Sequence, residues 1–489
     1  LPLGGGEGES LAAGRHAVVR QRRGTHSRPN RPAGQFAIAN PQSAILSDPD
    51  RVLARLDSFI SAYGARATLF ETWTHNPQLF ELLLLLFDRS EFLAEVAIRT
   101  PDLVDELVLS GRLRRRKSAE EIRTELRHGT GDADQRLWLR RYHQAEFMRI
   151  GLRDILGLAD YEQNFIELSA LAEACLQYTL EAVARAQRLG SAPVVIVGLG
   201  KLGGRELNYG SDLDIVFVAA DKAKERLPKL QEFAAQVMEM LSSQTELGIA
   251  FVTDARLRPD GEKGLLVNTL EAYEDYYRRR AHLWEIQALT RARAIAGDLR
   301  LGKQFEQLAA AVTDFRRFES GRPPHPGPLP LGGGEGEAPP ACLTPGWKKE
   351  IARIRARIEK ERTPVGQDAL AFKTGHGGLI DAEFIAQSMC LEHGWQEPNT
   401  LRALQRVRQE GALPRADAEK LIENYRQLRR VESILRRWSF EGEAVLPEDA
   451  PAFYRVSVRC GFTTPAAFRE AVAAWRMAIR EVYQAVFAV

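Results

Sequence analysis

The sequence predicts a predominantly α-helical α+β fold in which one small strand-containing unit lies between two helical regions. Apolar residues recur at intervals of three and four along residues 48–189, which is typical of amphipathic helices. Short runs rich in β-branched residues appear in the centre, within about residues 192–297. The chain has 489 residues, 44% of them hydrophobic and 27% charged, an ordinary composition for a soluble protein of about three domains.

A repeated string helps to divide the chain. LPLGGGEGE occurs at residues 1–9 and again at 329–337, and Pro/Gly-rich segments of this kind cannot bury a core. Residue 1 is Leu rather than Met, which is compatible with a fragment of a longer protein. The predicted divisions are a disordered tail at 1–35, a helical domain at 36–190, a strand-containing domain at 191–318, a linker at 319–345 and a second helical domain at 346–489.

The first helical region carries no strand signal between residues 48 and 189. Its pattern begins with Val52, Leu56 and Phe59, which share one helical face. Ser118 and Glu121 have the spacing of a capping box, so a helix is expected to begin there. The basic run before them is interpreted as a solvated loop rather than a nucleic-acid site.

The centre changes to strand patterns. Residues 193–198, 214–218 and 249–253 are short apolar runs that predict three strands. Residues 227–247 have helical periodicity and predict a long helix between the last two strands. We therefore expect a small α/β unit here.

The last region is predicted to be helical again. Residues 347–362 are expected to form an exposed, charged helix. Several further helices are expected over residues 379–489, with breaks at Pro398, Pro414 and Pro447.

The charge balance and the cysteines exclude several classes of protein. The 67 Lys and Arg residues nearly balance the 65 Asp and Glu residues, for a formal charge of +2, so no overall field would hold nucleic acid. The 4 cysteines lack the spacing of a zinc site or a disulfide framework, which favours a reducing, cytoplasmic location. No apolar run approaches the ~20 residues that a membrane-spanning helix needs.

A glycine-rich loop follows the first predicted strand. Gly198, Gly200, Gly203 and Gly204 lack the Cβ atoms that would keep a backbone away from a phosphate, and Lys201 adds a positive charge. The glycines spell GxGxxG, but the following stretch is too short for the crossover helix of a dinucleotide-binding fold. An ordinary glycine-rich turn is the alternative.

Acidic residues follow this loop. In a strand, Asp212 and Asp214 project from one face, a costly arrangement unless a cation lies between them. Such carboxylates suit Mg²⁺ or Mn²⁺; two solvent-exposed aspartates are the alternative. By the same two-residue repeat, Asp254, Arg256 and Arg258 are expected to share a face of the next strand. Asp254 would be a third metal ligand and the two arginines would bind phosphate. The alternative is that the arginines merely pair with Asp254 or nearby acids. Three aspartates beside a glycine loop suit two-metal phosphoryl transfer.

These motifs together resemble glutamine synthetase adenylyltransferase, a family with a polymerase-beta-type nucleotidyltransferase domain. The resemblance extends over most of residues 40–480, and the sequences of its motifs are closer to those of the C-terminal, adenylylating half of that family. The residues that carry the resemblance are 198–207, 210–214, 254–259, 284–293 and 372–384.

A second glycine motif, Gly375 to Gly378 beside Lys373, is either an anion site at a helix start or a tight turn.

The resemblance implies a small mixed-sheet nucleotidyltransferase domain that moves AMP from ATP to a tyrosine hydroxyl of glutamine synthetase. It implies glutamine synthetase as the protein substrate and a PII-type signalling protein as a further partner, with no nucleic acid and no membrane. The implied catalytic metal ligands are Asp212, Asp214 and Asp254, for Mg²⁺ or Mn²⁺. The implied ATP-binding residues are Gly203, Gly204 and Ser211, which cradle the triphosphate, and Lys201, Arg256 and Arg258, which neutralise it.

Two other functions remain open. One is a nucleotidyltransferase of the same fold that acts on an RNA end. Such an enzyme would require basic and aromatic residues interleaved along a groove to bind the RNA. A catalytically idle module would bind glutamine synthetase or a PII-type protein, although the three retained aspartates argue against lost chemistry.

Overall fold

The computed structural model describes residues 45–189, 194–316 and 340–487. Residues Phe36–Val489 form one compact unit, and the predicted division of this stretch into domains stays a prediction. The predicted tail, both copies of the repeated string and most of the predicted linker lie outside the described residues.

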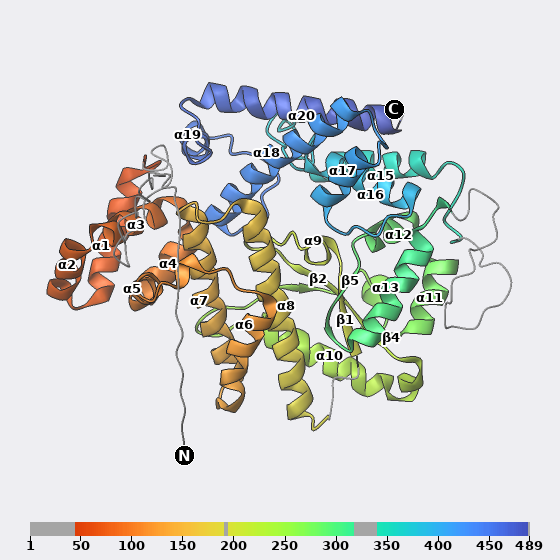
Figure 1. The fold of residues 1–489 in the computed structure, drawn as a ribbon, viewed down its shortest axis with the longest axis horizontal. Coiled ribbons are helices and arrows are strands. Elements are labelled where there is room, and N and C mark those ends of the chain that lie inside the picture. The colour runs from red at the N-terminus through yellow and green to blue at the C-terminus, as the bar shows by residue number, and fades with distance from the viewer. Residues whose placement is uncertain (1–44, 190–193, 317–339, 488–489) are drawn as a thin grey trace, which may run out of the picture. The chain divides into compact units, whose positions relative to one another are not determined.

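All regular elements described between residues 45 and 189 are helical, as predicted (Figure 1). The capping box is confirmed, since the Ser118 side chain accepts from the backbone of Glu121 and the Glu121 side chain accepts in return. The α-helices are α1 (Pro49–Tyr63), α2 (Arg66–His75), α3 (Pro77–Arg89), α4 (Glu91–Arg99), α5 (Asp102–Leu109), α6 (Ala119–Leu126), α7 (Gln135–Ile155) and α8 (Tyr161–Ala186).

The central sheet is mixed. Strand β1 (Val194–Gly198) runs antiparallel to both β2 (Leu213–Ala219) and β5 (Arg293–Gly297). Strand β2 runs parallel to β3 (Thr253–Asp254) and β4 (Val267–Thr269). The first two predicted strands are confirmed, whereas β4 and β5 were not foreseen.

The third predicted strand, at 249–253, is wrong except at its last residue. Ala250 and Phe251 donate their backbone N–H groups to the carbonyl of Leu241, at 3.0 and 3.3 Å, and not to a strand. Their apolar side chains are buried because they cover the end of α10 (Leu227–Ser242). The predicted helix over 227–247 is confirmed as α10, but it ends at Ser242.

The sheet lies between two hydrophobic cores. Along β1, Val195 and Val197 face a core shared with α11 (Leu270–Arg279), α13 (Leu299–Thr313) and the C-terminal helices. Val194 and Ile196 face the opposite core, shared with α8 and α10, because the side chains of a strand alternate between its faces. With both faces covered, β1 is apolar throughout.

The six helices described beyond residue 340 lie above the sheet in Figure 1 and share a hydrophobic core with α11 and α13. Pro398 and Pro447 lie between helices and Pro414 immediately precedes one, as predicted. The exposed helix predicted at 347–362 is present, but it buries Trp347, Ile351 and Arg355. The helices are α15 (Trp347–Arg362), α16 (Leu379–His393), α17 (Thr400–Gln409), α18 (Arg415–Ser439), α19 (Ala450–Arg459) and α20 (Pro465–Phe487).

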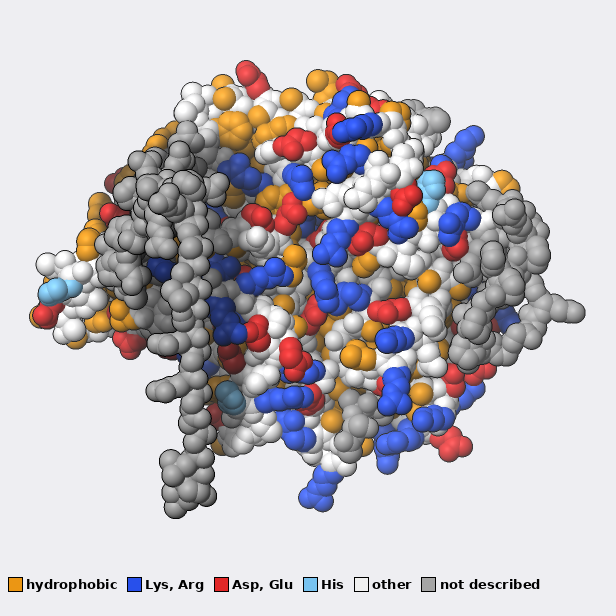
Figure 2. Space-filling view, in the orientation of Figure 1, with side chains coloured by type: hydrophobic (Ala, Val, Ile, Leu, Met, Phe, Trp, Pro, Cys, Tyr) orange, Lys and Arg blue, Asp and Glu red, His pale blue; other side chains and the backbone are white. Residues whose placement is uncertain are grey.

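The surface carries both charges. On the face drawn in Figure 2, Lys and Arg side chains are interspersed with Asp and Glu side chains rather than gathered into one basic field. Within the described ranges, no helix combines the length and apolarity needed to cross a bilayer.

Candidate active site

The glycine loop places the first strand against the second. After β1 the chain enters the short helix α9 (Gly200–Gly203), where Gly200 has a φ of +49°. A Cβ on Gly200 would overlap the Asp214 carboxylate, and one on Gly203 would overlap the carbonyl oxygen of Arg291. These glycines therefore permit close packing of the loop on its neighbours. The phosphate-cradling role of Gly203 and Gly204 stays a prediction, since neither lines the pocket described below.

Three aspartates meet at the end of β2. Asp214 and Asp254 are direct neighbours across the β2–β3 pair, and Asp212 precedes β2 by one residue. Burial, followed by the charges of Asp254 and Asp212, raises the pKa of Asp214 to about 6. The three carboxylates thus repel one another, which is the electrostatic condition that a bound cation relieves.

Asp254 is turned toward an arginine. Its two oxygens accept from Arg256 Nε at 3.0 and 2.9 Å, and this hydrogen bonding lowers the pKa of Asp254. Within residues 45–189, 194–316 and 340–487, no three His, Cys, Asp or Glu side chains are gathered in a metal-binding arrangement. The Asp254 carboxylate is thus hydrogen-bonded to Arg256 and is not free to bind a metal ion together with Asp212 and Asp214.

The expected common face of Asp254, Arg256 and Arg258 is wrong, because β3 ends at Asp254 and the alternation of a strand ends with it. Arg258 instead closes a turn, donating to the backbone carbonyls of Ala255 (2.8 Å), Glu262 (3.1 Å) and Gly264 (3.2 Å).

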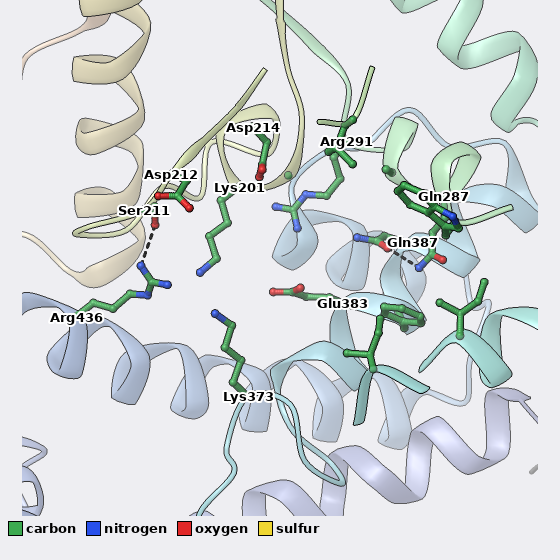
Figure 3. A pocket seen from close by; sticks show the side chains of 17 residues that line it. Lys201, Ser211, Asp212, Asp214, Gln287, Arg291, Lys373, Glu383, Gln387 and Arg436 are labelled. Carbon is green, nitrogen blue, oxygen red and sulfur yellow. Dashed lines mark hydrogen bonds between the residues drawn. The ribbon is translucent and has the colours of Figure 1, made fainter. Parts of the chain in front are cut away.

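A cavity of about 410 Å³ opens beside the aspartates (Figure 3). Of the predicted site residues, Lys201, Ser211, Asp212 and Asp214 line it, while those that do not are Gly203, Gly204, Asp254, Arg256 and Arg258. The opposite wall comes from distant segments, with Trp284 and Gln287 on α12 (Leu283–Leu289) and with side chains of α15, α16 and α18. The structure thus brings together one part of the predicted site and adds a wall that was not foreseen.

One end of this cavity is strongly cationic. The buried carboxylate of Glu432 on α18 accepts from Lys201 Nζ at 2.8 Å, and Lys373 Nζ lies 3.6 Å from the same oxygen. Arg429 and Arg436 also pair with Glu432. Four cations surround a single carboxylate, so a polyanion such as a triphosphate would find uncompensated positive charge here.

The second glycine motif is a tight turn. Gly377 has a φ of +66° and donates its N–H to Asp381 Oδ2 at 2.9 Å, so its amide is already satisfied. The carbonyl of Gly375 accepts from Arg355. Of the two alternatives for this motif, the structure has the tight turn at the glycines. The neighbouring Lys373 side chain points into the cavity (Figure 3).

Known proteins are similar to this chain over most of its length. A family model for glutamate-ammonia ligase adenylyltransferase matches residues 80–308. The chain is 32% identical over 411 residues to the bifunctional glutamine synthetase adenylyltransferase/adenylyl-removing enzyme of Aromatoleum aromaticum, and 31% identical over 434 residues to that of Nitrosococcus oceani. Over residues 80–308 this chain is a member of that adenylyltransferase family.

The match to these relatives covers most of this chain but less than half of each relative. The alignments cover 80% and 83% of this chain but 40% and 42% of the relatives, so the chain spans about two fifths of their length. A second family model, GlnD PII-uridylyltransferase, matches residues 348–487. The cavity lies between the adenylyltransferase region and this second region, since Asp214 belongs to the first and Lys373 to the second.

Sequence reasoning missed most of the far wall. Trp284, Gln287 and Arg291 belong to a motif that carried the resemblance to the adenylyltransferase family, but no chemistry had been assigned to them. Lys373 and Glu383 belong to another such motif. Arg436 is on a charged helix where nothing in the local pattern distinguishes it.

The cationic end leads to a pH prediction. Burial lowers the pKa of Lys201 to about 7, with Lys373, Arg436 and Arg429 repelling the ammonium and Glu432 attracting it. Lys201 is charged below this pKa, and a bound polyanion favours the charged form. We therefore expect inorganic tripolyphosphate to bind more weakly as the pH rises from about 6 to about 8.5.

Equilibrium dialysis of the wild type and of Lys201→Arg would measure this effect. The arginine stays charged over the whole range, so the variant reports only the titration of the tripolyphosphate itself. Identical pH profiles for the two proteins would contradict the prediction.

Proposed function

We propose that this chain transfers AMP from ATP to a tyrosine hydroxyl of glutamine synthetase. The observation that carries the proposal is the position of Asp212 and Asp214 at the mouth of a cavity whose adjoining end is lined by Lys201, Lys373 and Arg436 (Figure 3). This arrangement suits phosphoryl transfer, in which positioning and charge stabilisation supply most of the catalysis. The printed names of the relatives support the choice of acceptor.

The donor chemistry of the aspartates fits Mg²⁺ or Mn²⁺. Three hard carboxylate groups, Asp212, Asp214 and Asp254, lie at neighbouring strand ends, and burial together with the charges of the other two raises the pKa of Asp214. Asp254 becomes available once Arg256 releases it. When bound, divalent ions would supply charge stabilisation at the attacking and leaving oxygens.

The protein's own residues bind and orient the nucleotide. Lys201, Lys373 and Arg436 hold the triphosphate, and Arg436 is fixed in turn by a hydrogen bond to Ser211 Oγ at 3.3 Å. The tyrosine oxygen attacks the α-phosphorus, pyrophosphate departs toward the cationic end, and the phenolic proton passes to a carboxylate oxygen of one of the three aspartates.

Arg256 is assigned to ATP rather than to the protein acceptor. Its guanidinium is exposed and paired only with Asp254 among the described residues, so it is free to swing onto a phosphate oxygen. We expect Arg256→Ala to raise the KM for ATP by about tenfold while leaving the KM for glutamine synthetase nearly unchanged.

Steady-state kinetics with each substrate varied in turn would measure the two constants. Arg415→Ala is the control, because that exposed side chain is at the start of α18, whereas Arg436, which lines the cavity, is near the end of this helix. A rise in the KM for glutamine synthetase instead would move Arg256 to the acceptor-binding surface.

The proposal is tested with Mg²⁺, ATP labelled at the α-phosphate, and either glutamine synthetase or RNA. Label on a tyrosine-containing peptide of glutamine synthetase supports it, and label on an RNA end supports the alternative nucleotidyltransferase. A chain that binds glutamine synthetase without transferring label would be a regulatory module. A PII-type signalling protein is the second partner in this proposal, since residues 348–487 match the GlnD PII-uridylyltransferase model.

A further inference from the structure

The cavity has two ends of different chemistry. Lys201, Lys373, Arg436 and Asp212 lie at one end, while Gln287 and Gln387 lie at the other, with Glu383 between them (Figure 3). The second end has no role in the transfer step described above, although it occupies a large share of the cavity wall.

The amide end is also apolar. Trp284 lies three residues before Gln287 on α12, and Phe384 lies three residues before Gln387 on α16. Residues three apart share a helical face, so each amide has an aromatic ring as its neighbour. Ile354 and Ile358, one turn apart on α15, add to this wall. The indole of Trp284 is 39% exposed, a large apolar surface that is available to a flat ligand.

An unsatisfied hydrogen-bonding group lies at this end. Gln287 is 3% exposed, and its Nε2 donates to Gln387 Oε1 at 2.7 Å. Its own Oε1 is buried and accepts no hydrogen bond from any residue that the structure describes. Buried amide oxygens are normally satisfied, so this atom points to a ligand that brings a donor.

We propose that this end of the cavity is the nucleobase subsite and that the Gln287–Gln387 amide pair selects adenine. The proposal rests on the function proposed above and extends it to the choice of nucleotide. The exocyclic amino group of adenine donates to Gln287 Oε1, and the hydrogen bond from Gln287 Nε2 to Gln387 Oε1 holds that oxygen in its orientation. An amide oxygen of glutamine is a suitable acceptor for this amino group, while the rings of Trp284 and Phe384 stack on the base.

Guanine is disfavoured at the same place. It carries a carbonyl oxygen where adenine carries the amino group, so that oxygen would face Gln287 Oε1. Two acceptors would then oppose each other in a buried environment, which leaves both unsatisfied.

The order of groups along the cavity matches a nucleotide. The cationic end suits the triphosphate, and the amide end suits the base. The carboxylate of Glu383 lies between them and forms no ion pair or hydrogen bond within the described ranges. A free carboxylate at this position is an acceptor for the ribose hydroxyls, which lie between the phosphates and the base in ATP.

Binding of ATP, GTP and inorganic tripolyphosphate to the full chain would test the proposal, by equilibrium dialysis with Mg²⁺ at fixed pH. We expect the wild type to prefer ATP to GTP. Gln287→Leu and Gln387→Leu are expected to weaken ATP binding by about tenfold, to abolish the preference and to leave tripolyphosphate binding unchanged. Trp284→Ala, at an exposed position that should not affect folding, is expected to weaken ATP and GTP binding alike.

Gln427→Leu is the matched control, because Gln427 Nε2 donates to Glu423 on the surface of α18 (2.8 Å), away from the cavity. Unchanged ATP affinity and preference in both glutamine variants would overturn the base subsite, as would equal binding of ATP and GTP by the wild type. Retained tripolyphosphate binding shows that a variant is folded. Failure of the proposed function would look different: the wild type would bind ATP selectively yet transfer no AMP to glutamine synthetase.

Discussion

Replacing Asp214 by asparagine is expected to reduce AMP transfer to glutamine synthetase by about a thousandfold, while the chain remains folded. Asp214 lies between Asp212 and Asp254, and its burial beside two other carboxylates is an unfavourable arrangement that serves a cation rather than stability. The asparagine removes the charge that would hold the ion. Loss of about 4 kcal/mol of charge stabilisation in the transition state corresponds to a thousandfold change in rate.

The measurement is transfer of α-labelled AMP at saturating Mg²⁺ and ATP. Asp212→Asn is expected to act in the same direction, since Asp212 shares the cavity. The control is Asp260→Asn. Asp260 is exposed, pairs with Arg280 and has a φ of +61°, a conformation that asparagine also tolerates. Near-normal turnover of Asp214→Asn would show that the aspartates are not the metal ligands.

The largest expected effect on stability is that of Glu206→Gln. The Glu206 side chain, 5% exposed, pairs with the equally buried guanidinium of Arg291 and accepts from the backbone N–H of Thr400 at 2.7 Å. It thus joins the end of the glycine loop to the start of α17. Removing its charge takes away the ion pair that the buried Arg291 forms with Glu206 and leaves only the more distant charge of Glu383 among the described residues, and breaking a buried pair in this way typically costs about 3–5 kcal/mol.

Urea denaturation of the full chain would measure the loss in the free energy of unfolding. Glu419→Gln provides the comparison, because Glu419 pairs with Arg415 in an exposed ion pair that is expected to contribute less than about 1 kcal/mol. If the two substitutions had equal effects, the Glu206–Arg291 pair would not be the joint that stabilises this region.

The parts of the fold that could be predicted from sequence are those set by local patterns. Both faces of β1 are covered, so it is apolar at every position, and the helix breaks fall at or beside Pro398, Pro414 and Pro447. The strand β5 was missed because it begins with Arg293, pairs along only one edge and carries several half-buried residues. Such a strand resembles a loop until its partner is known.

The site shows a similar limit. Asp212 and Asp214 were predicted correctly as neighbours at a strand end, because they adjoin a regular strand. The alternation could not be extended from Asp254 to Arg258, since the chain turns after two strand residues. Lys373 and Arg436 are far from the aspartates in sequence, and only the packing of α16 and α18 brings them to the cavity.

Because both faces of the sheet are packed against helices, the strand-containing segment is not easily separated from the rest of the chain. A fragment that stopped at residue 316 would keep α11 and α13, which pack on the sheet, but it would lose the helices that share their core and the cavity lining that α15, α16 and α18 supply. Transplanting the strand end into another scaffold would therefore carry over the aspartates without most of the other residues that line the cavity. The strand unit therefore depends on helices on both of its sides, α8 before it and α11, α13 and the later helices after it.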